Sequence, residues 1–543
     1  MEAETSPAPP LPDDVLAAIL GRLPPRALAA SRRVCRAWRA AVDARGLLLR
    51  HALPRAVRGV FVNFIDYRRP RFFARPSPED APAVDGGLGF LPRHPCGTLW
   101  PVRDHCNGLL LYGTERALFV ANPATRRWQR LPPRDDGAGH VSYLAFDPAA
   151  SPHYEVVLIP HVPEKPTRPD PRGAPQIHPR ERKKKKKEAR RALPRRKGDD
   201  PVTAFNLSSL FSSLDDTEDW WARSVEEDEE GQEGYLPTIT APPPASSPEP
   251  EPEPEDPCRF LEWPPSPWTV PVFSSSAGRW EERSFVREGD AVGITVEDAR
   301  ADSLRPVDWG PRWRYGVYWQ GAFYVHCRGA FVMRLSLTDG KYQVIRPPID
   351  IEEGKHVRPC LGRSEKGVYF ATIQDRWQCL LRVWILSESC GHMVWVLKHH
   401  IDLEPTALWA AVRLNYHHQI DGPWRLDGDS DDEADNRGML PKENLEWDSD
   451  NDNVVDDEED SGEDRYDQIY FLGFHPCKEV VFLKLAFTGI AFHLNTSKVQ
   501  YLGRLRPKDY YYTYSAGVYE SFIYTPCLIG ELPETGLETH LDD

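Results

Sequence analysis

The chain of 543 residues contains 17 histidines, including the pairs His399-His400 and His417-His418. None of them forms an H-E-x-x-H zinc motif, and no G-x-S-x-G nucleophile elbow or Walker phosphate-binding loop occurs. Histidine pairs beside strands, without further ligands, are usually structural or solvated. The sequence therefore predicts no catalytic residue, no metal site and no cofactor.

Ten cysteines are scattered along the chain and never form a C-x-x-C pair. Zinc sites need such spacing, and disulfide scaffolds are shorter and richer in cysteine, so reduced thiols in the cytosol or nucleus are the simplest interpretation. Residues 1–10 lack the basic and apolar regions of a secretory signal, and no stretch approaches 18 apolar residues. We expect no membrane span and a location in the nucleus, the cytoplasm or both.

The formal net charge of -15 comes from one segment, because residues 427–467 hold 19 acidic and 3 basic side chains. Four acids there match ligand positions of an EF-hand calcium loop, namely Asp448, Asp450, Asp452 and Glu459. Asn453 replaces the required glycine, and no amphipathic helix flanks the loop. Such a match arises easily by accident in an acidic segment, so we expect no calcium site.

A basic segment lies at residues 180–197. Its centre is a run of five lysines, Lys183, Lys184, Lys185, Lys186 and Lys187. Such a run can be a nuclear localisation signal, a nucleic-acid patch or a solvated part of a loop. Single-stranded nucleic acid would favour aromatic side chains between the basic ones, and there are none. Nuclear import and the solvated loop stay open, and nucleic acid is the least favoured partner.

Three short helices are predicted between residues 11 and 52. Asp13 can cap the first, and Pro24-Pro25 can end it and begin the second. The apolar stripes of the first and third helices consist of Val15, Leu16, Ile19, Leu20 and Leu23 and of Val34, Cys35, Trp38, Ala41 and Val42. A unit of about 40 residues buries too little surface to be stable alone, which indicates a partner.

The pattern L-P-D-D-V-L-x-x-I-L-x-R-L-P-P-x-x-L, followed by Val34–Arg39, resembles an F-box. The resemblance implies docking on a Skp-type adaptor, which bridges to a cullin scaffold and a ubiquitin-conjugating enzyme. The positions that it assigns to the adaptor are Leu11, Pro12, Leu16, Ile19, Leu20, Leu23, Pro24, Leu28, Val34 and Trp38. Some of these must form the core of the unit instead, and the sequence cannot divide the two groups.

Beyond residue 57 the pattern changes to short strands. Five segments predict a strand, a turn and a second strand with an aromatic residue, leading from 119–123 to Trp128, 272–273 to Trp280, 331–335 to Tyr342, 383–386 to Trp395 and 490–494 to Tyr501. Without two insertions, the aromatics lie roughly 50 to 65 residues apart, which favours propeller blades over a two-sheet sandwich. Apolar runs such as Val480–Leu483 suit strands buried on both faces.

Short pieces of this half also resemble the F-box-associated β domains of plant F-box proteins. They are Cys106–Leu111, Asn122–Thr125, Gly473–Pro476 and Phe492–Thr496. The two insertions depart from the compact pattern of that family.

Composition divides the chain into a sequence of segments. We expect a disordered start at 1–10, the F-box at 11–52, an all-β domain in three parts at 57–163, 263–420 and 466–532, and a tail at 533–543. Residues 164–262 and 421–465 are too poor in apolar side chains to order themselves, so we expect two disordered insertions. The fold class is α+β, a three-helix F-box followed by a β domain for which a six-bladed propeller is favoured.

Both ends of the β domain lack a complete blade. The strand predicted at Gly59–Phe64 has no hairpin, nor have those at Val518–Tyr524 and Cys527–Ile529. An open ring would leave two bare sheet edges. We therefore expect the first and last strands to pair and complete a sixth blade, with five or seven blades as the alternatives.

These features predict a non-catalytic substrate receptor of an SCF-type (Skp–cullin–F-box) ubiquitin ligase. The F-box would hold the adaptor, and the β domain would bind an unknown target protein and concentrate its lysines near the conjugating enzyme. One alternative is a propeller-fold enzyme, which needs a convergent cluster of titratable groups. Another is a nuclear regulator that binds nucleic acid through the basic run.

Overall fold

A computed structural model describes much of the chain. The described residues are 13–23, 28, 31, 34–44, 47, 56–65, 67, 69–76, 84–93, 100–114, 117–134, 139–163, 165, 256–301, 315–327, 331–348, 357–364, 366–374, 379–389, 392–403, 408, 422–427, 469–508, 510, 517–527 and 532. The chain divides into two compact units, residues 1–162 with 262–543 and residues 163–261. All the elements described below belong to the first unit.

In the part of the chain that the structure describes, helices are few and short. They are α1 (Asp13–Leu20), α3 (Arg36–Ala44) and α7 (Val296–Ala301). Leu28 and Ser31, between α1 and α3, are also helical. The helices α1 and α3 contact each other and form a small helical module at the N-terminus, as the sequence predicts.

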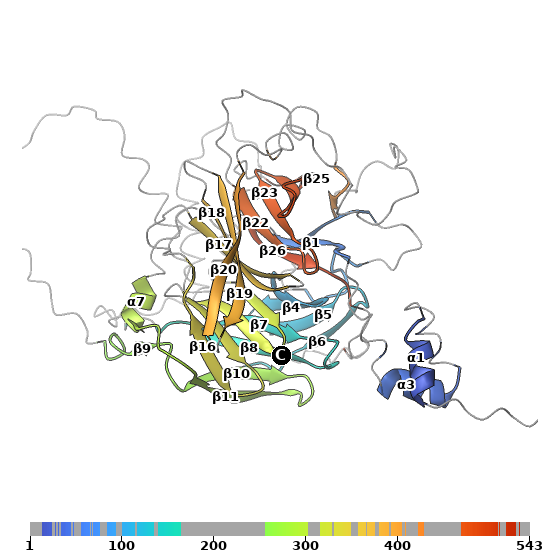
Figure 1. Cartoon of the computed structure of the whole chain (residues 1–543), viewed down its shortest axis with the longest axis horizontal. Coiled ribbons are helices and arrows are strands. Elements are labelled where there is room, and N and C mark those ends of the chain that lie inside the picture. Colours follow the sequence, from blue (N-terminus) through green and yellow to red (C-terminus); the bar gives the residue numbers. More distant parts are fainter. Residues whose placement is uncertain are drawn as a thin grey trace, which may run out of the picture. The chain divides into compact units, whose positions relative to one another are not determined.

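Most of the described strands lie in groups of four, and Figure 1 shows how the strands are arranged. Two sheets follow chain order, β3 (Val102–Cys106), β4 (Leu109–Thr114), β5 (Ala117–Asn122) and β6 (Arg127–Arg130), and β17 (Val357–Ser364), β18 (Gly367–Gln374), β19 (Leu380–Ser389) and β20 (His392–Asp402). A third is β22 (Ile469–Phe474), β23 (Val480–Leu485), β24 (Thr488–His493) and β25 (Val499–Arg504).

The largest sheet has eight strands and consists of two antiparallel groups of four. One group is β7 (His140–Phe146), β8 (Tyr154–Pro160), β10 (Trp268–Ser274) and β11 (Arg279–Arg287), and the other is β13 (Gly316–Trp319), β14 (Ala322–Cys327), β15 (Phe331–Ser336) and β16 (Lys341–Ile345). Only a short parallel pairing of β11 with β16 joins the two groups. A separate pair is formed by β9 (Glu262–Trp263) and β12 (Ile294–Thr295).

The two ends of the β domain meet in one sheet. Its order is β21 (Arg425–Leu426), β2 (Arg71–Ala74), β1 (Gly59–Phe64) and β26 (Val518–Tyr524). The strands β1 and β26 run antiparallel, with Val60 opposite Ile523 and Phe61 opposite Phe522, and lie side by side in Figure 1. The predicted pairing of the first and last strands is confirmed. Cys527 lies outside any strand, and 528–529 are not among the described residues.

All five predicted hairpins are present. They are β5 with β6, β10 with β11, β15 with β16, β19 with β20, and β24 with β25. The second strand of each carries the aromatic residue that marks it in the sequence. The run Val480–Leu483 lies in β23, which is buried along its whole length, as expected for a strand covered on both faces.

One strand of each four-strand group, always at the edge of its group, contacts the corresponding strands of two other groups. The contacts run from β3 to β7, β13, β17, β22 and β26, and from β26 back to β3. We call these six the inner strands. Their close approach depends on glycine at particular positions, because a Cβ on Gly362 of β17 would lie 2.3 Å from a ring carbon of Phe474.

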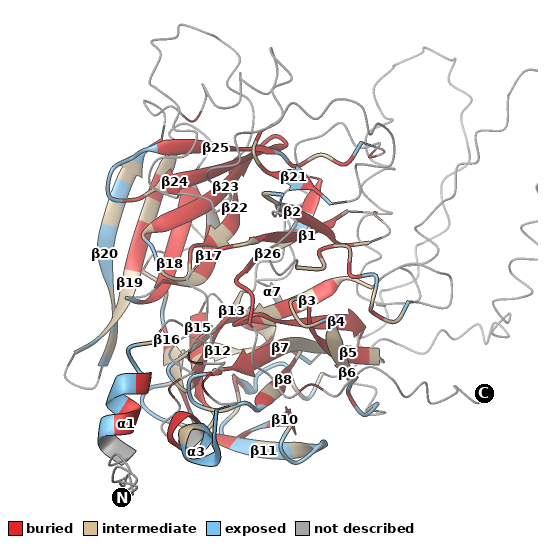
Figure 2. Ribbon diagram, turned by 90° about the vertical axis from the view of Figure 1, so that its right-hand side faces the viewer, coloured by how far each residue is buried: buried red, intermediate tan, exposed pale blue. Residues whose placement is uncertain are grey.

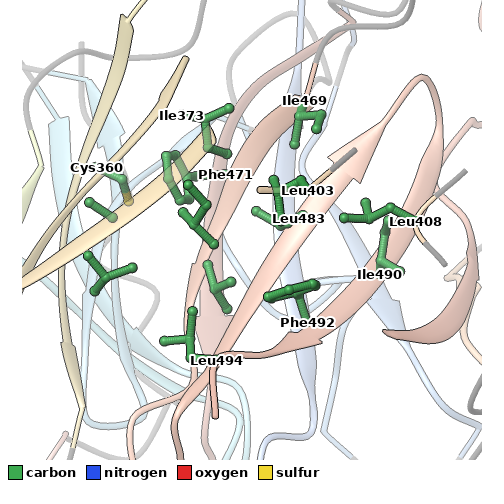
Figure 3. Close-up of a cluster of buried hydrophobic side chains, with 14 of the residues drawn as sticks. Cys360, Ile373, Leu403, Leu408, Ile469, Phe471, Leu483, Ile490, Phe492 and Leu494 are labelled. Atoms are coloured by element: carbon green, nitrogen blue, oxygen red, sulfur yellow. The ribbon is translucent and has the colours of Figure 1, made fainter. Parts of the chain in front are cut away.

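Apolar side chains fill the space between neighbouring sheets. Figure 3 shows one such cluster, in which Cys360 and Ile373 from β17 and β18 face Phe471, Leu483 and Phe492 from β22, β23 and β24. Burial of this kind is the main favourable term in folding.

Each of the two expected insertions has a short strand near one of its ends. β9 begins at Glu262, the last residue of the first range, and β21 lies inside the range 421–465. Trp424 is buried beside β21, with its ring 5.5 Å from that of Phe73 and 6.3 Å from that of Phe482. A single buried tryptophan thus anchors a short strand within a range that composition alone marks as polar.

Candidate functional site

The helical module has a small core of its own. Four leucine and valine side chains are almost completely buried: Leu16 and Leu20 of α1, Leu28 between the two helices, and Val42 of α3. Leu20 and Val42 are each 1% exposed. The Ser31 hydroxyl donates a hydrogen bond of 2.6 Å to the Leu28 carbonyl, within the helical segment between α1 and α3. Leu23 and Trp38 are partly buried at the edge of this core.

Three large apolar side chains of the same module face outward. Val15 is 44% exposed, Ile19 47% and Val34 62%. Val15 and Ile19 are four residues apart on α1, so they lie on the same side of that helix, and Figure 2 shows α1 with both buried and exposed parts. The core does not use this apolar surface, and a partner can bury it.

The structure separates the predicted adaptor-binding residues into groups. Leu16, Leu20 and Leu28 belong to the core, so their side chains are not accessible to a partner. Ile19 and Val34 are exposed, and Leu23 and Trp38 lie between the two groups. Leu11, Pro12 and Pro24 lie outside the described residues.

Val15 is an exposed residue that the sequence-based site omits. It belongs to the apolar stripe of the first helix, together with Ile19. The spacing of four between them was the available signal, since it places both on one side of the helix, whereas Leu16 and Leu20 form the adjacent, buried row.

A partly open cavity of about 120 Å³ lies between the inner strands of the β domain. Residues of β3, β13, β17, β22 and β26 line it. Polar groups among them are Asp104, His105, Asn107, Arg363 and Glu520. The sequence gives no sign of this site, because its residues come from five strands spread over more than 400 positions.

Burial controls the ionisation of the groups at this cavity. Desolvation, together with the positive charge of Arg363, lowers the pKa of His105 to about 4, although the Ile523 carbonyl acts in the opposite direction. Burial raises the pKa of the Cys106 thiol to about 12, and the charge of Arg363 opposes this only in part. At neutral pH the imidazole is uncharged and Cys106 is a thiol, the weakly nucleophilic form.

A second polar cluster surrounds Glu479, in the turn between β22 and β23. Its Oε1 accepts a hydrogen bond of 2.7 Å from the Tyr369 hydroxyl and lies 3.2 Å from Lys366 Nζ. His399 Nε2 lies 3.5 Å from Oε2. His399 therefore faces a buried carboxylate, while His400 is exposed.

Other sequence candidates lie outside the described residues. These are the lysine run at 183–187, the EF-hand-like acids at 448–459 and the pair His417-His418. Within the described part of the chain, no group of three or more His, Cys, Asp or Glu side chains is arranged to hold a metal ion. None of the described helices is long and apolar enough to cross a membrane.

Comparison with known families identifies the helical module. Residues 9–53 match the F-box-like family model. No curated protein matches the chain. The N-terminal module is therefore an F-box-like domain, and F-box domains bind Skp1-type adaptors in SCF complexes.

Proposed function

We propose that this protein is the substrate-recognition subunit of an SCF-type ubiquitin ligase. The F-box docks on a Skp-type adaptor, which joins it to a cullin scaffold, and the β domain binds a target protein. The observation that carries the proposal is the F-box-like match at residues 9–53, in a module that leaves Val15, Ile19 and Val34 exposed.

The exposed apolar side chains supply the energy for docking. Complete burial of a valine or isoleucine side chain contributes about 1.5–3 kcal/mol. Each of these three is about half exposed in the free module, so an interface that covers them gains roughly half of that per residue. Leu23 and Trp38, at the edge of the core, extend the same surface.

For the β domain we propose a six-bladed propeller of the type that the resemblance to plant F-box-associated domains implies. The four-strand groups, the cycle of contacts between the inner strands and the β1–β26 pairing support it. A sandwich of two face-to-face sheets fits this topology poorly. A propeller presents loops on a rigid scaffold, which suits recognition of a protein target.

We propose a non-catalytic role. The cavity between the inner strands brings His105 and Cys106 near Arg363. A nucleophilic cysteine needs a lowered pKa, and that of Cys106 is raised. This favours the receptor over the propeller-fold enzyme.

We also propose that the protein works in the nucleus, the cytoplasm or both, with nuclear entry directed by the lysine run at 183–187. The alternative nuclear regulator would bind DNA or RNA through the same run, with an affinity that falls steeply as salt rises.

Docking can be tested with variants on the exposed side of the F-box. Ile19→Asp and Val34→Asp should each weaken capture of a purified Skp-type adaptor by about tenfold or more, because a charge replaces an apolar contact. Ala40→Asp, at an exposed site of α3, is the matched control and should bind as wild type does.

Circular dichroism of each variant separates lost docking from lost folding. Leu20→Ala removes a core side chain and should act through unfolding, at a cost of about 2–5 kcal/mol. No capture by the wild-type chain, or equal capture by the Ile19 and Val34 variants, would show that the proposed function is wrong.

A further inference from the structure

The cavity between the inner strands has mainly apolar walls and one polar side. Leu361 of β17, Phe471 and Phe474 of β22 and Ile523 of β26 are among the apolar residues. The polar side is formed by His105 of β3, by Asn107 in the turn that follows β3, and by Arg363 of β17. A pocket with apolar walls and a few convergent polar groups is the usual form of a small-molecule site.

Arg363 is a cation without a carboxylate partner among the described residues. Its Nη2 donates a short hydrogen bond to Asn107 Oδ1, a neutral acceptor. The two acids at the cavity bond elsewhere, because Asp104 accepts from the Leu144 amide at 2.8 Å and Glu520 accepts from Asn63 Nδ2 at 3.3 Å. A guanidinium has five N–H donors in a planar fork that matches a carboxylate, and one neutral acceptor leaves most of them available.

His105 adds a second polar group that the protein does not satisfy. Its Nδ1 is buried and has no hydrogen-bond partner in the described structure. A buried polar atom without a partner costs about 1–3 kcal/mol. The uncharged ring donates its one N–H to the Ile523 carbonyl, so Nδ1 is an acceptor and leaves an anionic group of a ligand to Arg363.

Both polar atoms of the Asn107 amide already form hydrogen bonds within the protein. Asn107 Nδ2 already donates to the Phe146 carbonyl at 2.6 Å, and its Oδ1 is taken by Arg363. The charged donors left for a ligand are therefore the remaining N–H groups of Arg363, whose positive charge favours an oxyanion over a cation or a neutral amine.

Size restricts the body of the ligand. An engineered apolar cavity of about 150 Å³ holds benzene, and this cavity has about 120 Å³. The apolar walls suit a hydrocarbon body no larger than about one ring.

We propose that the β domain binds a small amphipathic monocarboxylate in this cavity, with the carboxylate at Arg363 and the apolar body against Leu361 and Phe474. The ligand joins β17 and β22, which stand next to each other only in the folded domain, and so stabilises the domain. This proposal does not depend on adaptor docking, because it concerns the β domain alone.

The test uses the full chain and two probe pairs, benzoate against benzamide and hexanoate against hexanamide. The two members of each pair have nearly the same shape, but only the acid carries a negative charge. At least one acid should raise the unfolding temperature and bind in a titration, about tenfold more tightly than its amide. Equal binding of acid and amide, or no binding of either acid, would overturn the proposal.

Variants locate the site. Arg363→Gln should lose about tenfold or more in affinity for the acid, while Arg363→Lys, which keeps the charge, should lose less. Arg504→Gln, at an exposed arginine at the end of β25, is the control and should bind as wild type does. If Arg363→Gln does not fold, the comparison of each acid with its amide on the wild-type chain still tests the proposal. An acid that binds equally to wild type and to a folded Arg363→Gln chain would overturn the assignment.

Discussion

Glu479 illustrates at the scale of one residue how burial and pairing compete. Burial alone raises the pKa of this carboxyl, but contacts with His399, Tyr369 and Lys366 outweigh it and lower the pKa to about 2. The folded state therefore holds the ionised form more firmly than the unfolded chain does. By linkage, this difference in pKa is a contribution to stability.

The sign of the pH dependence follows from the lowered pKa. The contribution of Glu479 is complete above its unfolded pKa, near 4.5, and is lost as pH falls from there towards 2. Glu479→Gln should lower the free energy of unfolding at pH 7 by about 1–3 kcal/mol, and the gap to wild type should shrink as pH falls. Urea unfolding at pH 7 and at lower pH measures both.

Glu281→Gln is the control for this prediction. Glu281 forms a surface pair with Arg279 at 3.2 Å, and such pairs contribute about 0–1 kcal/mol. A Glu479→Gln effect that is no larger than that of the control, or that does not change with pH, would contradict the prediction.

At the scale of elements, the close packing of the inner strands depends on glycines, which carry no side chain. Gly362 of β17 faces the Phe474 ring of β22. Gly473 has φ of 137° and lies beside Ile523 of β26, a combination that suits glycine both sterically and conformationally. These positions set how closely neighbouring sheets pack around the cavity.

Gly362→Ala should therefore destabilise the β domain by about 1–3 kcal/mol, as overpacking does, because the new Cβ would lie 2.3 Å from Phe474. Thermal unfolding measures the loss. Gly89→Ala is the control, since nothing lies within 4 Å of a Cβ there. Adding Phe474→Leu to Gly362→Ala should restore part of the stability; no recovery would indicate that the clash is not the cause.

The basic segment is an element that the sequence alone defines. Changing Lys183 to Lys187 together to Ala should shift a fluorescently tagged chain from nucleus to cytoplasm. The same five positions changed to Arg keep the charge and should leave the distribution as in wild type. An unchanged distribution of the Ala variant would leave the run as a solvated part of a loop.

For the whole molecule, the pairing of β1 with β26 joins residues more than 450 positions apart. All six residues of β1 are buried, and without β26 this strand would present an unpaired, apolar edge. The sheet that contains β1 therefore needs β26 as its edge strand. The contacts of this sheet with β3 and β22 also depend on β26.

Truncation tests this dependence. A chain that ends at residue 532 keeps β26 and should unfold cooperatively near the wild-type temperature. A chain that ends at residue 516 lacks β26 and should lose the cooperative transition or aggregate, because several buried strands lose their neighbour. Circular dichroism on heating distinguishes the two, and equal stability of both chains would refute the dependence.

Local patterns in the sequence determined the F-box-like module and the five hairpins. A helix stripe such as Val15–Ile19, or a turn such as Asp339-Gly340, involves only residues close in the chain, so its signal can be read directly. Closure was also predictable, because two unpaired strands at opposite ends have few ways to satisfy their edges.

The tertiary structure alone decided which apolar residues of the F-box are buried. Leu16 and Ile19 have the same chemistry and belong to the same stripe, and only the packing of α1 against Leu28 and α3 separates them. It also decided that Trp424 anchors a strand within a polar stretch.

The cavity depended on tertiary structure entirely. Arg363 and Asn107 are 256 positions apart, and neither stands out from other polar residues in its strand. Their pairing follows from how the sheets pack, since distant strands become neighbours only when the apolar faces between them are buried. Sequence patterns report which element a residue belongs to, and packing between elements determines what that residue faces.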